Sequence, residues 1–168
     1  MKSIIALMVS AALLTGFTAA QAETRNHRVG FGVNYWYAID DIDVGDIDDS
    51  GLSYLVTYQY KPSVVGIQLD GEMLPDRLGE DAYAAAGYLV VGGAIYGSIG
   101  VGILNVDGEW ADDPFYALRL GLDSELLPGI HLDISGSYRF DSATKIDDAL
   151  DDYDTDTVFL GAAARFEF

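Results

Sequence analysis

Cysteine is absent from this 168-residue chain, and positively charged residues are scarce. The lack of cysteine excludes a small scaffold that is held together by disulfides. Nine Lys and Arg residues stand against 27 Asp and Glu, which gives a formal net charge of −18. A chain this acidic is unsuited to binding nucleic acid or another polyanion, because such binding depends on basic side chains that neutralise phosphate charge.

Long apolar runs are also missing, except at the N-terminus. Lys2 precedes an apolar run from Ile4 to Leu14, and Ala20-Gln21-Ala22 has the form of an A-x-A cleavage site. The run is too short for a comfortable membrane-spanning helix. This layout predicts a cleaved secretory signal over residues 1–22, with a retained N-terminal anchor as the alternative. The mature chain would then be a single domain over residues 23–168.

An exported chain with 50% hydrophobic residues and no helical span must bury its apolar surface in a core or show it to lipid as a β-barrel. The last eleven residues, from Val158 to Phe168, favour the barrel. One face of this segment is entirely apolar, whereas the other carries Arg165 and Glu167. Such a strand suits a lipid-facing exterior and a polar interior, and its length fits the ~9–11 residues with which a tilted strand crosses a bilayer.

The same period-two alternation recurs along the mature chain and separates eight predicted strands. They cover residues 27–39, 52–61, 64–74, 82–91, 95–103, 116–125, 130–140 and 158–168. Both faces of segment 82–91 are apolar, so the pattern does not say which of them would face lipid. Nineteen glycines and eleven tyrosines suit tight sheet turns and aromatic membrane girdles.

The connections alternate between short and long, as they do in membrane barrels. The four long segments, 40–51, 74–81, 105–114 and 141–156, hold 20 of the 27 acidic residues. With both termini on the periplasmic side, all four would be extracellular. The prediction is therefore an all-β, eight-stranded antiparallel up-and-down transmembrane β-barrel in the outer membrane. The alternative is a secreted β-sandwich or lipocalin-like barrel, which would bury the apolar face.

A strand of this kind that ends Arg165-Phe166-Glu167-Phe168 resembles the C-terminus of small eight-stranded bacterial outer-membrane barrels, the class of OmpX, Ail and the OmpA membrane domain. The resemblance covers the whole mature chain as a pattern, and only these four residues approach a motif. It implies that Phe166 and Phe168 are an assembly signal read by the barrel assembly machinery. It also implies contact with outer-membrane lipid and lipopolysaccharide, and a monomeric state.

The inward faces of the predicted strands carry charges of both signs. Because an eight-stranded barrel has room for side chains and little else, we expect these charges to form a paired network that fills the lumen. Arg119 and Asp70 should lie near mid-height, and Glu72 and Arg139 nearer the outer mouth. The expected network comprises Asp70, Glu72, Arg119, Asp123, Glu125, His131, Asp133, Arg139, Arg165 and Glu167, together with Gln59 and Gln68.

The first long segment offers the one candidate metal site. Asp41, Asp43, Asp46 and Asp48 alternate with other residues around Gly45, and calcium prefers several carboxylate oxygens on an adaptable loop. The spacing does not meet the EF-hand pattern, because no Glu stands at the required distance and the Gly is displaced. The alternative is a solvated acidic surface without a dedicated site, and no other cofactor is predicted.

An enzyme that modifies lipid A would need a histidine in a catalytic set. His131 shares a strand face with Asp133 and Ser135, but residues two apart along a strand point in parallel ~6.5–7 Å apart, so these three do not by themselves form a relay. The predicted function is therefore a non-enzymatic outer-membrane barrel with acidic surface segments and a structural or surface-interaction role. A narrow pore for ions or small solutes is the main alternative, and a barrel enzyme is the other.

Overall fold

The computed structural model describes residues 26–38, 50–75, 81–106, 108–141 and 157–168, and nearly all of them lie in β-strands. The strands are β1 (His27–Ala38), β2 (Ser50–Tyr60), β3 (Val65–Leu74), β4 (Ala82–Gly92), β5 (Ile95–Val106), β6 (Glu109–Trp110), β7 (Phe115–Leu127), β8 (Ile130–Asp141) and β9 (Thr157–Glu167). In this part of the chain no helix has the length and apolar composition that crossing a membrane would require.

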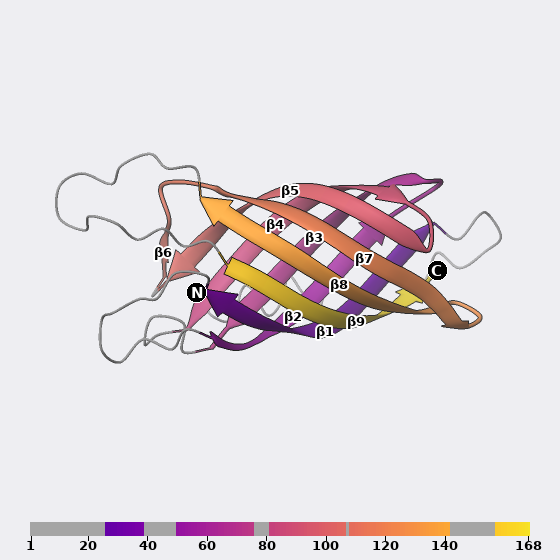
Figure 1. Ribbon diagram of the computed structural model, residues 1–168, viewed down its shortest axis with the longest axis horizontal. Helices are drawn as coiled ribbons and strands as arrows, with labels where there is room; N and C mark the ends of the chain where they lie inside the picture. Colours follow the sequence, from indigo (N-terminus) through magenta and orange to yellow (C-terminus); the bar gives the residue numbers. More distant parts are fainter. Residues whose placement is uncertain (1–25, 39–49, 76–80, 107, 142–156) are drawn as a thin grey trace.

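The strands form one closed antiparallel sheet, and the long tilted strands wrap around a common axis (Figure 1). Neighbours follow the order β4-β3-β2-β1-β9-β8-β7-β5, and pairing of β4 with β5 closes the ring. The first and last strands meet along a seam that runs from Arg28 opposite Glu167 to Ala38 opposite Thr157. Closure leaves no unpaired edge along the barrel wall. The predicted eight-stranded up-and-down barrel is confirmed, and β6 is a two-residue addition to it.

The two ends of the barrel differ. One end, here called the short-turn end, carries the tight connections 61–64, 93–94 and 128–129 together with Phe168. The opposite end, here called the β6 end, carries β6 (Figure 1). Gly129, with φ of 78°, sits in the β7–β8 turn, where a left-handed backbone favours glycine.

The outward face of the eight long strands carries no Asp, Glu, Lys or Arg in the described residues. Large apolar side chains are exposed there instead; Leu120, for example, is 73% exposed. Aromatic side chains gather toward both ends of this belt. At the β6 end these are Tyr35, Tyr37, Tyr54, Tyr83, Trp110 and Tyr116, and at the short-turn end Tyr60, Phe166 and Phe168. An apolar belt between two aromatic girdles is the exterior of a barrel that sits in a bilayer.

The burial of its side chains shows which face of β4 lies inside the barrel. Ala82, Ala84, Ala86, Tyr88 and Val90 are buried in the lumen, and the face with Tyr83, Leu89 and Val91 is exposed. Small side chains on the inner face leave space for rings from the neighbouring strands. Sequence periodicity could not decide this, because alanine and glycine fit either environment.

Inward glycines pair across strands with large side chains. The four aromatic pairs are Trp36 with Gly51, Tyr88 with Gly100, Phe115 with Gly102, and Tyr96 with Gly121. A Cβ on any of these glycines would overlap the ring opposite. Each ring therefore lies flat over a site without a side chain, which is how a narrow bore can hold several aromatic residues.

The third predicted loop, 105–114, is partly strand. β5 continues to Val106, and Glu109 and Trp110 fold back onto it, with Trp110 opposite Asn105. Gly108, with φ of 86°, provides the left-handed residue that this tight return needs. The return extends the β6 end beyond the boundary that alternation alone had indicated.

We expect Gly100→Ala to lower the free energy of unfolding by ~1–3 kcal/mol, the usual penalty for overpacking a filled interior. The new methyl group would overlap the Tyr88 ring and lie 2.9 Å from the Gly87 carbonyl oxygen. Urea unfolding of the refolded barrel in lipid vesicles measures the change. Gly71→Ala is the matched control, because its Cβ meets nothing within 4 Å on the outer face. Equal stabilities of the two variants would contradict the packing argument.

Candidate functional site in the barrel lumen

The inward side chains of the barrel form a polar network along its axis, from the β6 end to the short-turn end. Period-two alternation directs them inward, because every second residue of each strand faces the lumen. Buried charged groups need partners of opposite sign or hydrogen bonds to neutral groups. The network meets this requirement through three levels, each built from strands that are distant in sequence.

The level nearest the β6 end is organised around Glu72 of β3. Its carboxylate accepts hydrogen bonds from Asn34 Nδ2 at 2.5 Å, from Ser53 Oγ and from Arg139 Nη2, which also makes the ion pair. The Arg139 guanidinium lies over the Phe159 ring, 3.9 Å from its centroid. Glu72 and Arg139 are both buried, so this charge pair is shielded from solvent.

The middle level pairs Arg119 of β7 with Asp70 of β3. Arg119 Nη2 lies 2.9 Å from Asp70 Oδ2, and the guanidinium lies 4.2 Å from the centroid of the Tyr88 ring. Asp70 Oδ1 also accepts a hydrogen bond of 2.8 Å from Gln68 Nε2. Arg119 and Asp70 are both buried, and the stacked tyrosine covers the cation.

Below this level, Gln68 connects the middle of the lumen to the short-turn end. Its Oε1 accepts hydrogen bonds from Gln59 Nε2 at 3.0 Å and from Arg165 Nη2 at 3.2 Å. Arg165 is 1% exposed and is the largest fully buried side chain of the described residues. Its Nη1 lies 3.3 Å from Asp133 Oδ2 and 3.6 Å from Asp123 Oδ2.

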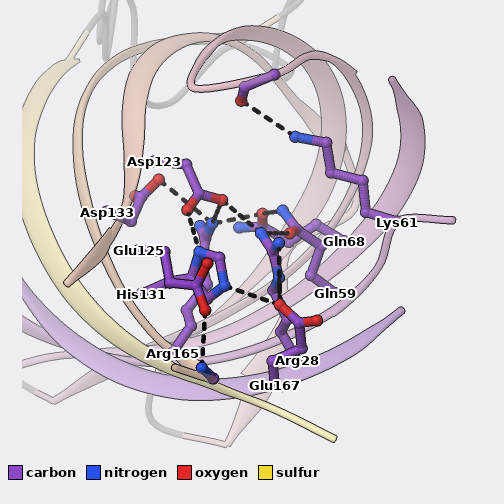
Figure 2. Close-up of polar contacts among 12 residues, drawn as sticks. Arg28, Gln59, Lys61, Gln68, Asp123, Glu125, His131, Asp133, Arg165 and Glu167 are labelled. Atoms are coloured by element: carbon purple, nitrogen blue, oxygen red, sulfur yellow. Dashed lines mark hydrogen bonds and ion pairs between the residues drawn. The ribbon is translucent and has the colours of Figure 1, made fainter. Parts of the chain in front are cut away.

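At the short-turn end, four side chains from β1, β7, β8 and β9 form a closed ring (Figure 2). Arg28 Nη1 lies 2.6 Å from Asp123 Oδ2, and Asp123 Oδ1 lies 2.9 Å from His131 Nδ1. His131 Nε2 lies 2.8 Å from Glu167 Oε2, and Glu167 Oε2 lies 3.3 Å from Arg28 Nη2. Acidic and basic side chains alternate around this Arg28–Asp123–His131–Glu167 ring.

Lys61, in the β2–β3 turn, crosses the mouth of the lumen beside the ring. Its Nζ donates a hydrogen bond of 3.3 Å to the Gly93 carbonyl oxygen in the β4–β5 turn (Figure 2). Burial lowers the pKa of the Lys61 ammonium, since partial removal from water disfavours its charge. The side chain thereby joins the β2–β3 and β4–β5 turns.

The sequence analysis did not include Arg28 in the lumen network. It expected Glu125 in the network, whereas the structure has Glu125 at the rim. Arg28 lies at an even-numbered position of β1, on the same face as Gly30 and Asn34, so extending the alternation to the strand end would have found it. Glu125 was expected in the network but is exposed at the rim, where its Oε1 accepts a hydrogen bond of 2.9 Å from Gly129 N. The strand irregularity between Glu125 and Leu127 turns the chain away from the lumen there.

The residues that resemble a catalytic set around His131 make other contacts in the structure. Both ring nitrogens face the carboxylates of Asp123 and Glu167, and Asp133 lies against Arg165. The arrangement therefore orders a histidine inside an ion-pair network. It does not align Asp133, His131 and Ser135 as a nucleophile relay, which requires the nucleophile and the base within hydrogen-bond reach.

The candidate calcium ligands Asp41, Asp43, Asp46 and Asp48 lie outside the described residues, so that site stays a prediction. Within the residues that the structure describes, no cluster of three His, Cys, Asp or Glu side chains is arranged to hold a metal ion. Phe166 and Phe168 lie at the short-turn end on the outer face. The Phe166 ring centroid is 6.1 Å from that of Phe31, and the Phe168 ring stacks on His27 at 5.9 Å.

The chain is similar to known proteins in its structure but not detectably in its sequence. No protein-family model matches it, and no curated protein is significantly similar to it in sequence. Neisserial surface protein A superposes with a TM-score of 0.59 at 13% identity, over 85% of this chain and 97% of the other. The N-terminal β-barrel domain of Pseudomonas aeruginosa OprF gives a TM-score of 0.54 at 11% identity, over 87% and 100%. At these identities the likeness establishes the shared barrel fold.

We expect Glu72→Leu to lower the free energy of unfolding by ~3–5 kcal/mol, because it leaves the Arg139 guanidinium buried without its anion. The double variant Glu72→Leu/Arg139→Met should recover most of this loss, since it removes both charges and keeps similar volumes. Urea unfolding in lipid vesicles measures both variants. Glu109→Gln, at an exposed position, is the control and should change little. A double variant no more stable than the single one would show that the pair contributes by packing rather than by charge.

Proposed function

We propose that this protein is a non-enzymatic β-barrel of the bacterial outer membrane that displays acidic segments at the cell surface. The observation that carries the proposal is the distribution of charge across the barrel wall. The outer face of the described strands holds no charged residue, whereas the lumen holds nine Asp, Glu and Arg side chains in ion pairs. A barrel in water would reverse this distribution, because its exterior must be solvated.

The patterns near the two ends of the sequence support a route for export and assembly. We infer that residues 1–22 are removed as a secretory signal and that Phe166 and Phe168 act as the assembly signal. Both termini of the described barrel lie at the short-turn end, and this supports a periplasmic short-turn end and an outer β6 end. The completed barrel would be a monomer surrounded by outer-membrane lipid and lipopolysaccharide.

The surface role belongs to the acidic segments between strands. Carboxylates that project into the lipopolysaccharide layer would sit among the divalent cations that bridge its phosphates, with or without a dedicated calcium site at Asp41, Asp43, Asp46 and Asp48. Trp110, which is 59% exposed at the β6 end, adds an apolar contact for adhesion to a partner. The name of Neisserial surface protein A describes a surface protein with the same fold, which supports this role.

The orientation can be tested by cysteine labelling, since the chain has no native cysteine. Asp112→Cys, in the exposed connection at the β6 end, should react with a membrane-impermeant maleimide on intact cells. Ser63→Cys, in the exposed β2–β3 turn, is the matched control and should react only after the outer membrane is permeabilised. The reverse order of labelling, or labelling of neither variant in membranes, would contradict the proposal.

A narrow pore for ions or small solutes is the second candidate function. It is favoured by buried lumen atoms that lack a hydrogen-bond partner among the described residues, such as Tyr88 Oη and Ser98 Oγ. Water at these atoms would wet one side of the lumen. The three ion-paired levels and the rings seated on glycines argue for a closed interior.

We expect the refolded protein to show no stepwise conductance in planar bilayers, because Arg165 and its partners block the bore. Single-channel recording at both polarities measures this. Arg165→Ala, which removes the largest fully buried side chain of the described residues, is the internal comparison and should leak more than the wild type. Sustained unit openings of the wild-type protein would replace the closed-barrel proposal with the pore.

A further inference from the structure

The Arg28–Asp123–His131–Glu167 ring closes only in one protonation state of histidine. Both ring nitrogens of His131 lie within hydrogen-bond distance of a carboxylate oxygen, at 2.9 Å for Nδ1 and 2.8 Å for Nε2. A neutral imidazole has a single N–H, so its second nitrogen would present a lone pair to an oxygen that is also only an acceptor. Asp123 and Glu167 also pair with Arg28, which favours the ionised form of both carboxyl groups. With both ionised, both contacts are favourable when each nitrogen donates, as in the imidazolium form.

The charged groups around His131 come from every element that packs against it. On β7, Asp123 bonds its Nδ1 and Glu125 lies opposite it in register but is exposed and bonded to Gly129 N. On β9, Glu167 bonds its Nε2, and Arg165 is its register partner. Asp133 is on its own strand and pairs with Arg165, and Arg28 of β1 faces it across the ring. Lys61 is bonded away from it, to the Gly93 carbonyl oxygen.

The ring also lies where the barrel closes. It joins β7 and β8 to both strands of the β1–β9 seam, and Arg28 is paired directly with Glu167 in that seam. We propose that the ring is a proton-dependent clamp at the short-turn end, closed when His131 carries two ring protons and weakened when it loses one. Loss of the proton removes one charge-assisted hydrogen bond. The seam beside Arg28 and Glu167 then loosens, while the seam near Trp36 and Phe159 does not.

The protonation state is tested directly by nitrogen-15 NMR of the imidazole rings in the refolded wild-type protein. A series of spectra over increasing pH follows the ring, because histidine is the side chain that ordinarily changes charge near neutral pH. We expect an acidic form in which both His131 nitrogens carry protons and an alkaline form in which one proton has been lost. His27, the other histidine, is assigned with His27→Gln. A His131 ring that carries only one proton in the acidic form, where the clamp should be closed, would overturn the proposal.

The mechanical consequence is tested by amide hydrogen exchange, corrected for intrinsic rates. Between the acidic and the alkaline form, protection at Phe166 and Phe168, whose N–H groups face β1 across the seam, should fall roughly tenfold relative to Leu160, whose N–H group faces the same seam near its other end. This is the size of effect that loss of one hydrogen bond to a charged group implies. His27→Gln, at the same end but outside the ring, should keep this response, and His131→Gln should abolish it. An equal response in His131→Gln and the wild type would overturn the proposal. If His131→Gln does not refold, Glu167→Gln removes one arm of the ring and should reduce the response.

Discussion

A chain segment inside a lipid bilayer has no water with which to pair its backbone N–H and C=O groups, and the whole structure depends on this constraint. The eight long strands satisfy it by closing on themselves, through β4 with β5 and β1 with β9. Closure in turn divides the side chains into two sets by parity. One set contacts lipid and is uncharged, and the other is confined to a bore too narrow to be filled with bulk water.

Confinement explains why the lumen combines rings on glycines with paired charges. A bulky residue fits only where the strand opposite has no side chain, as with Tyr96 over Gly121 and Trp36 over Gly51. A charged residue is tolerated only beside its counterion, as with Arg119 and Asp70. The interior is therefore occupied by its own side chains. The proposed surface role therefore depends on parts of the chain outside the lumen, such as Trp110, which is exposed at the β6 end.

The ion pairs are spread unevenly along the barrel axis, and this distribution affects how firmly each end of the barrel is held together. The β6 end and the middle each rest on one arginine–carboxylate pair, whereas the short-turn end gathers Arg28, Arg165, His131 and three carboxylates. The densest network thus lies at the short-turn end of the seam between the first and last strands. The proposed proton-dependent clamp would act at this end, because His131 forms part of the network.

The sequence by itself determined the strand alternation, the lipid-facing surface and most of the inward charges. This is because the alternation of apolar and polar residues shows which face of each strand contacts lipid and which faces the polar lumen. It could not orient β4, whose faces both carry small apolar residues, and it stopped short of Arg28 and of the β6 return. Only the tertiary structure decided which inward charges pair with one another. Arg28 and Asp123 are 95 residues apart and meet because strand tilt and register bring β1 and β7 to the same height across the lumen. Such cross-lumen contacts depend on the geometry of closure, which no local pattern encodes.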